Sequence, residues 1–299
     1  MKVLIMDIDS KIPNLALKKI EKYHKDKGDE VVWNNELMRF SSDKIYVSCI
    51  FTENKSLCDE WSGAEIGGTG YDIMKKLPPE IDSVKPRINL GFTTRGCIRK
   101  CEFCFVPQKE GMIKFEGDIY DIWDGISKEI VLMDNNILAL PKHFKMICSQ
   151  LRKEKLKVDF NQGLDIRLLN DDLAGELATI RHISDIRFAW DNIKDEAVIR
   201  KGITLLKKHN CRRGMFYVLV GFNSTIDEDL YRFNTLKGLG QRAYCMRFKT
   251  VKGQREYSDI ASWVNQVRFF ESMTFDRYRE CRGNRELVKK FTSVGIKSI

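Results

Sequence analysis

No stretch of this 299-residue chain is apolar over the roughly 20 residues that a membrane-spanning helix needs, so a helical membrane protein is excluded. A secretory signal is missing too, and we therefore expect a reducing, cytoplasmic location in which the nine cysteines are thiols rather than disulfides. The hydrophobic content of 43% is enough to build a large core. The chain is expected to be a soluble enzyme with one larger and one smaller domain.

Two common ligand motifs are incomplete. The run Gly67-Gly68-Thr69-Gly70 lacks the glycine spacing and the strand-before, helix-after context of a phosphate-binding loop, and a turn is the better interpretation. The pair Cys101 and Cys104 has the spacing of a zinc ligand pair, but no second such pair of Cys or Cys and His completes a closed tetrahedral site. These absences argue against a nucleotide loop and against a zinc knot.

Three cysteines do stand close together, in the run Gly-Phe-Thr-Thr-Arg-Gly-Cys-Ile-Arg-Lys-Cys-Glu-Phe-Cys-Phe-Val-Pro (91–107): Cys97, Cys101 and Cys104. Cysteine thiolates are the usual ligands of iron–sulfur clusters. Because a 4Fe–4S cluster has four irons, three protein ligands leave one iron open to another molecule. The spacing therefore predicts a reactive cluster.

This C-x3-C-x2-C pattern, with the aromatic Phe103 just before the last cysteine, resembles the signature of the radical S-adenosylmethionine (SAM) enzymes. The resemblance implies that SAM chelates the open iron through its amino and carboxylate groups, with Phe103 among the cofactor-binding residues. It also implies that a reductant of the flavodoxin or ferredoxin type supplies the electron that cleaves SAM to a 5′-deoxyadenosyl radical. In such enzymes the cofactor does the hard chemistry and the protein positions it.

Strands and helices alternate along the chain, which predicts an α/β fold with parallel sheets. Residues 1–84 form a separate unit in this interpretation, with Pro78, Pro79 and Pro86 marking a linker. The unit resembles the Rossmann-like, cobalamin-binding-like domain that precedes the core in one branch of the radical SAM superfamily. The family's Asp-x-His-x-x-Gly ligand motif is absent, and the one histidine of the unit, His24, is expected to face solvent. We therefore expect no bound cobalamin.

Residues 85–260 resemble the radical SAM core, a partial (β/α)6 barrel of the TIM type. Its six strands are expected at 88–92, 130–133, 158–160, 185–191, 215–222 and 243–248. The first strand would deliver the cysteines at its carboxyl end, where parallel barrels build their sites.

The resemblance also implies where SAM is held. The family binds the SAM ammonium after the second strand, although its commoner form there is glycine-rich with a glutamate. Amides after the third strand suit ribose hydroxyls, and an arginine suits the SAM carboxylate. Backbone at the end of the fifth strand bonds the adenine. The expected SAM contacts are Asp134 and Asn135 after the second strand, Asn161, Gln162 and Arg167 after the third, and Gly221 after the fifth.

Charge is unevenly spread along the chain. Residues 1–130 carry 20 Lys and Arg against 22 Asp and Glu, whereas the remainder carries 31 against 20, a net charge of +11. The stretches 142–157, 200–213 and 237–255 are basic, and residues 261–299 interleave aromatics with arginines. Solvated helix faces and core aromatics explain any one stretch, but their concentration in one half favours a polyanionic partner such as nucleic acid.

The sequence thus predicts a cytosolic radical SAM enzyme that abstracts hydrogen from an unidentified substrate, because a fold family does not fix the substrate. One alternative is a methylthiotransferase-like or methylating enzyme acting on RNA, which the run Cys104-Phe105-Val106-Pro107 resembles. Those enzymes carry further cysteines in the N-terminal domain for a second cluster, and a C-terminal RNA-binding module. Here the N-terminal domain offers only Cys49 and Cys58, at an unsuitable spacing, and we expect no such module. The other alternative is a zinc- or nucleic-acid-binding protein without redox activity.

Overall fold

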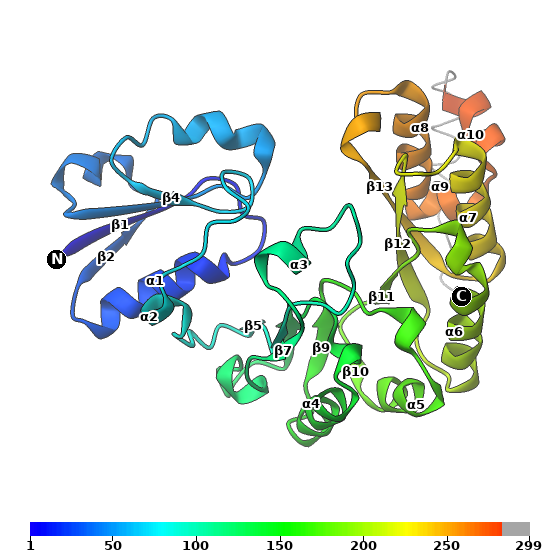
Figure 1. Ribbon diagram of the computed structural model, residues 1–299, viewed down its shortest axis with the longest axis horizontal. Helices are drawn as coiled ribbons and strands as arrows, with labels where there is room; N and C mark the ends of the chain where they lie inside the picture. The colour runs from blue at the N-terminus through cyan, green and yellow to red at the C-terminus, as the bar shows by residue number, and fades with distance from the viewer. Residues whose placement is uncertain (283–299) are drawn as a thin grey trace. The chain divides into compact units, whose positions relative to one another are not determined.

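A computed structural model describes residues 1–282 of the chain. The chain divides into two compact units, Met1–Gln162 and the part from Gly163 onward (Figure 1). The boundaries near residues 84 and 260 that the sequence suggests stay a prediction.

The first unit opens with a sheet of four parallel strands in the order β2-β1-β3-β4. The chain passes through β1 (Lys2–Asp7), α1 (Leu15–Asp26), β2 (Glu30–Trp33), the 3-10 helix η1 (Glu36–Ser41), β3 (Lys44–Ser48), the 3-10 helix η2 (Thr52–Cys58) and β4 (Glu65–Gly67). Successive side chains of a strand point to opposite faces of its sheet. The four consecutive buried residues of the central strand β1 therefore show that both faces of the sheet are covered there. Helix α1 starts at Asn14, whose side chain caps it by accepting a hydrogen bond from Leu17 N–H.

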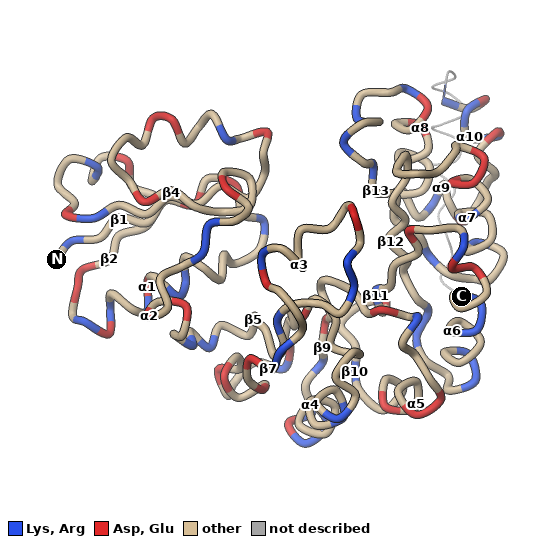
Figure 2. The backbone as a smooth tube through the Cα atoms, in the orientation of Figure 1, with Lys and Arg blue, Asp and Glu red and all other residues tan. Residues whose placement is uncertain are grey.

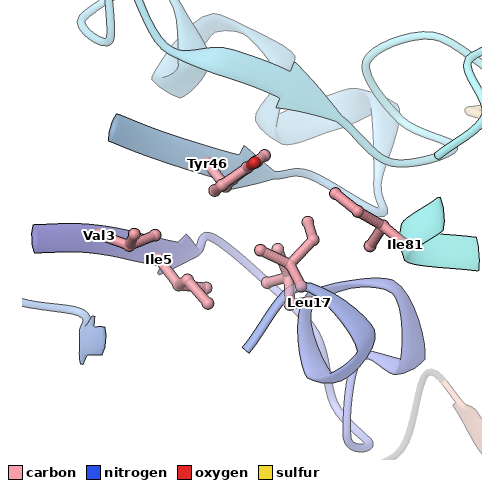
Figure 3. Packing of buried hydrophobic residues seen from close by; sticks show 6 residues of the cluster. Val3, Ile5, Leu17, Tyr46 and Ile81 are labelled. Atoms are coloured by element: carbon pink, nitrogen blue, oxygen red, sulfur yellow. The ribbon is translucent and has the colours of Figure 1, made fainter. Parts of the chain in front are cut away.

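One face of this sheet packs against α1 and the short helix α2 (Pro79–Asp82). Figure 3 shows Val3, Ile5, Leu17, Tyr46 and Ile81 pointing toward one another in this core. Fully burying an aliphatic side chain such as Ile81 is worth about 1.5–3 kcal/mol, and only 3% of Ile81 is exposed. The segment expected to be a linker is therefore held to α1 by its own apolar side chain.

His24 does not face solvent, contrary to expectation. Only 3% of it is exposed, and its Nδ1 and Nε2 lie 2.7 Å from Asp29 Oδ2 and 3.1 Å from the Tyr46 hydroxyl. Its lysine neighbours in the sequence suggested an exposed helix face. Asp29 and Tyr46 instead provide hydrogen-bond partners for both ring nitrogens inside the sheet–helix interface, and this offsets the cost of burying the ring.

The rest of the first unit adds three parallel strands, which pair as β5 (Leu90–Gly91) with β8 (Glu129–Leu132) and β8 with β9 (Lys157–Phe160). An antiparallel hairpin of β6 (Thr94–Arg95) and β7 (Lys114–Phe115) stands between β5 and β8 in the chain. The connecting helices are α3 (Val106–Lys109), η3 (Ile119–Asp121), η4 (Ile137–Ala139) and α4 (Pro141–Lys153). These strands lie where the apolar runs predict them, although β5 is shorter than expected.

The second unit is built on the parallel sheet β11-β12-β13, formed by β11 (Ile186–Ala189), β12 (Gly214–Val220) and β13 (Arg242–Arg247). Helices α6 (Glu196–Lys208), α7 (Ile226–Gly238) and α8 (Arg255–Val264) run along one side of it (Figure 1). Thr225 caps α7 in a capping box with Glu228. The remaining elements before α8 are η5 (Ile166–Leu168), α5 (Asp171–Thr179), β10 (Arg181–His182), η6 (Ile193–Asp195) and η7 (Lys249–Val251).

The aromatic residues between positions 261 and 282 are core residues. Helices α9 (Val267–Ser272) and α10 (Phe275–Arg282) follow α8, and all five of the aromatics in question are at most 7% exposed: Trp263, Phe269, Phe270, Phe275 and Tyr278. The interpretation as packing rather than as a stacking surface is thereby confirmed. Of the interleaved arginines, Arg285 lies outside the described residues.

The predicted α/β class is confirmed, because the main sheets of both units are built from parallel strand pairs. Across residues 1–282, the longest and most apolar helices fall short of what a bilayer crossing demands.

Candidate functional site

The three predicted ligand cysteines lie on one loop, residues 96–113, which we call the cysteine loop. It leaves the sheet just after β5 and is closed at its neck by the β6–β7 hairpin, through the pairs Thr94–Phe115 and Arg95–Lys114. All three sulfurs therefore belong to a segment whose two ends are fixed side by side.

Gly96 begins the loop in a backbone conformation that favours glycine. Its φ is 88°, and a Cβ there would lie 2.5 Å from the carbonyl oxygen of Met112 and 2.6 Å from that of Gly111. The next amide, Cys97 N–H, donates to the Gly111 carbonyl at 3.1 Å. The glycine thus lets the two arms of the neck approach one another directly before the first cysteine.

The three cysteines are partly buried. Cys97 Sγ accepts hydrogen bonds from Arg99 N–H at 3.3 Å and from Asn136 Nδ2 at 3.4 Å, and Cys104 N–H donates to the Cys101 carbonyl at 3.0 Å. Three thiols on one short loop are a donor set that suits an iron–sulfur cluster, and donors aimed at sulfur suit a thiolate. Within residues 1–282 the thiols are not converged, since no three His, Cys, Asp or Glu side chains are grouped so as to hold a metal ion.

Asp134, expected near the SAM ammonium, holds the start of the β6 hairpin. It is 4% exposed, and its carboxylate accepts hydrogen bonds from the backbone N–H and the hydroxyl of both Thr93 and Thr94. Burial raises the pKa of Asp134, although the hydrogen bonds from Thr94 and Thr93 oppose the shift. The carboxylate oxygens are engaged by the two residues that precede Arg95.

The next two residues also reach the cysteine loop. Asn135 Oδ1 accepts a hydrogen bond from Gly96 N–H at 3.1 Å, and the Asn136 amide donates to Cys97 Sγ. Asn136 ends the polar run 134–136 that the family resemblance places near the SAM ammonium, and here it contacts the first cysteine. The triplet 134–136, just after β8, therefore contacts four of the five residues 93–97, all but Arg95.

The other expected cofactor residues of the first unit lie on the cysteine loop and at the end of β9. Phe103 is 36% exposed on the cysteine loop. Asn161 continues the β8–β9 pairing through its backbone, with its N–H 2.9 Å from the Leu132 carbonyl, and Gln162 is exposed.

In the second unit, Arg167 already pairs with carboxylates. Its Nε and NH2 donate to the two oxygens of Asp165 at 2.7 and 3.2 Å, and NH1 lies 3.4 Å from Asp195 Oδ2. Asp165 also caps η5 by accepting from Arg167 N–H. The fork that the sequence offers to a SAM carboxylate is thus held by side chains of the same unit.

Gly221 also has a local structural reason to be glycine. Its φ is 71°, and a Cβ would lie 2.4 Å from Val251 Cγ1. Its N–H donates to Asp229 Oδ2 at 3.1 Å. This hydrogen bond occupies the amide that the family resemblance would direct toward adenine.

Asp191, which follows β11, is a titratable residue that the sequence did not single out. Burial raises its pKa, and the N–H of Leu219 donates to its Oδ1 at 3.1 Å. A partly buried carboxyl at the carboxyl end of a parallel strand is a typical position for a functional group. Its acidic side chain and its place after an apolar strand were the available signals.

Many cations of the basic stretch 200–213 have acidic or carbonyl partners. Arg200 pairs with Glu196, Lys208 with Asp171 and Arg213 with Glu271, while Arg212 NH1 donates to the His182 carbonyl. Lysines and arginines recur along α6 in Figure 2, but the linear run overstates the uncompensated charge.

In comparisons with known proteins, no family model and no curated protein matches the chain. The residues and their contacts therefore have to support any functional assignment.

Proposed function

We propose that this protein is a radical SAM enzyme in which Cys97, Cys101 and Cys104 ligate a 4Fe–4S cluster. The observation that carries the proposal is that all three thiols lie on one loop at the carboxyl end of a parallel strand. The neck of that loop is held by the residues that follow the neighbouring strand β8. Active sites of parallel α/β folds are built at this end of their strands.

When bound, such a cluster and SAM supply a 5′-deoxyadenosyl radical that abstracts hydrogen from the substrate. The residues of the chain itself hold the cysteine ligands in position. Asp134 and Asn135 fix the neck, and Asn136 donates a hydrogen bond that orients Cys97 and stabilises its thiolate. We therefore assign Asp134 and Asn135 to holding the loop, rather than to the SAM ammonium as the family resemblance implies.

For SAM we retain five contacts as part of the proposal: Phe103, Asn161, Gln162, Arg167 and Gly221. Arg167 belongs to this set because a guanidinium forms charge-assisted hydrogen bonds to carboxylates, as it does here to Asp165 and Asp195.

The finer fold belongs to the same proposal. Six parallel strands follow residue 85, namely β5, β8, β9, β11, β12 and β13, which is the number that a partial (β/α)6 barrel requires. The four-stranded sheet of residues 1–84 supports a Rossmann-like N-terminal domain.

The expected partners follow from the chemistry. A flavodoxin- or ferredoxin-type protein would supply the electron, and the nine free thiols are compatible with a reducing cytoplasm. The basic residues beyond position 130 support RNA as the substrate or its carrier.

Anaerobic reconstitution with ferrous iron and sulfide tests the assignment. The wild-type chain should gain about four irons and the brown charge-transfer absorbance of a 4Fe–4S cluster. Replacing Cys97, Cys101 or Cys104 by alanine should remove both, whereas Cys211→Ala, which changes a partly buried thiol bonded to the Ala174 carbonyl, should remove neither.

Full iron content in the Cys101→Ala protein would overturn the cluster assignment. Stoichiometric zinc without absorbance in the visible range would identify the redox-inactive metal protein instead.

A further inference from the structure

A buried lysine of α1 meets the acid that ends α2. Lys19 Nζ donates to the Asp82 carbonyl oxygen and, at 2.7 Å, to Asp82 Oδ1, and its side chain is 6% exposed. Burial lowers the pKa of Lys19, while the hydrogen bond from Nζ to Asp82 and the Asp82 charge oppose the shift. A lysine this enclosed depends on its carboxylate partner.

The other oxygen of the same carboxylate binds the neck of the cysteine loop. Asp82 Oδ2 accepts from Arg95 NH1 at 3.1 Å, and Arg95 is the β6 residue directly before Gly96. The Arg95 guanidinium also lies 4.7 Å from the centre of the Phe92 ring and 3.7 Å from Glu110 Oε2, near the far end of the loop. One arginine therefore contacts Glu110 in the far arm of the loop as well as Phe92, the residue that follows β5.

The opposite strand of the hairpin contributes as well. Burial would raise the pKa of Asp82, but Lys19, Arg95 and Lys114 of β7 outweigh it, so the pKa is lowered. Asp82 is thus an acid surrounded by cations from α1, β6 and β7.

From this geometry we infer that Asp82 is a positioning residue for the cysteine loop. It ties the neck of the loop to helix α1, so that the N-terminal sheet serves as the base on which the cluster ligands are held. The inference rests on the proposed function only in treating this loop as a cluster-binding loop.

A purely structural role is the competing explanation. In that case Asp82 fastens α2 to α1, and its loss lowers the stability of the whole unit without a specific effect on residues 96–113. A positioning role instead predicts selective opening of the loop in a protein that remains folded.

The test compares Asp82→Asn, which removes the charge at constant size, with Asp82→Glu, which restores it. Asp26→Asn is the matched control, since it breaks an exposed ion pair of α1 with Lys22. The full-length, iron-free protein is treated with trypsin, for which the loop offers three cleavage positions: Arg99, Lys100 and Lys109. Cleavage of a transiently open segment follows the population of the open form.

We expect Asp82→Asn to be cleaved in the loop roughly tenfold faster than wild type, the order expected for a partly exposed charged hydrogen bond. Asp82→Glu should restore much of the protection, and Asp26→Asn should match wild type. After reconstitution, Asp82→Asn should also lose iron to a chelator several times faster.

Equal loop cleavage in Asp82→Asn and wild type would overturn the inference. If Asp82→Asn does not fold, Arg95→Gln carries the same expectation, because it breaks the loop contact and keeps the Lys19–Asp82 pair. The proteolysis needs no iron. A chain that binds no cluster would therefore refute the proposed function while the role of Asp82 was still decided.

Discussion

At the scale of single residues, the Asp229–Arg232 pair shows how a buried charge is made tolerable. Both side chains are fully buried. Arg232 donates to Asp229 and to the carbonyl oxygens of Trp190 and Leu219, at 2.7 and 2.8 Å, and Asp229 accepts the Gly221 N–H. Burial raises the pKa of Asp229, and the Arg232 charge opposes the shift. The pair thus satisfies backbone groups at the ends of two neighbouring strands.

Replacing Arg232 by methionine should therefore be costly. It would leave a buried carboxyl and two carbonyl oxygens without their donor, and the loss in the free energy of unfolding should be about 3–5 kcal/mol. Urea denaturation measures it as a lower midpoint with an unchanged slope. Arg200→Met, which breaks the exposed pair with Glu196, should leave the midpoint almost unchanged. Equal effects of the two substitutions would contradict this account.

The hydrogen-bond partners of single side chains are also what the sequence predicts least well. The spacing of Cys97, Cys101 and Cys104 identified them as candidate ligands, because that pattern is local. Nothing local indicated that Asp134 would accept hydrogen bonds from Thr93 and Thr94, some 40 positions earlier. An acidic residue after a strand looks the same whether a ligand or a neighbouring loop is its partner.

At the scale of elements, the neck of the cysteine loop combines three kinds of restraint. The β6–β7 ladder joins its arms, Asp134 and Asn135 hold it from β8, and Asp82 holds it from α2. Each uses backbone or charged groups rather than apolar packing. Such a neck can be fixed while the residues beyond it adjust to a cluster.

Gly96→Ala should therefore disturb cluster assembly more than Gly111→Ala. Both glycines have positive φ, 88° and 77°, but a Cβ at Gly96 meets two carbonyl oxygens, whereas one at Gly111 meets nothing within 4 Å. Iron content after reconstitution should fall in the Gly96 variant and stay near the wild-type value in the Gly111 variant. Since both carry the same backbone strain, the difference isolates the steric contact. Equal iron contents would show that the neck tolerates separation of its arms.

Elements were also the most predictable part of the fold. Apolar runs located β8 and β12, because buried parallel strands are continuous hydrophobic stretches. The short helix α2 was interpreted as linker, since Pro78 and Pro79 stand together at its start. Pro79 is nevertheless an acceptable first helical residue, and the apolar side chain of Ile81 decides the packing.

At the scale of the whole molecule, the net charge of +9 does not show which Lys and Arg side chains are paired with acidic groups and which are not. Charge counted along the sequence predicted a basic half but not which cations remain uncompensated. On α6, Lys208 has Asp171 as partner, and beyond the helix Arg213 has Glu271. Lys201 and Lys207 are exposed and have no ion pair among residues 1–282.

This distinction yields the last prediction, on binding of single-stranded RNA. If cations on and just after α6 contact phosphates, each contact releases counterions, and the logarithm of the association constant falls with the logarithm of salt concentration by about 0.7 per contact. Lys201→Ala with Lys207→Ala should reduce that slope by about 1.4 and weaken binding uniformly across sequences. Lys208→Ala with Arg213→Ala removes the same formal charge but should change the slope less, because Asp171 and Glu271 already compensate those cations. Fluorescence titrations of labelled RNA at several salt concentrations measure both slopes. Equal slopes in the two double variants would show that the intramolecular pairs open on binding, and no binding at low salt would exclude RNA as the polyanionic partner.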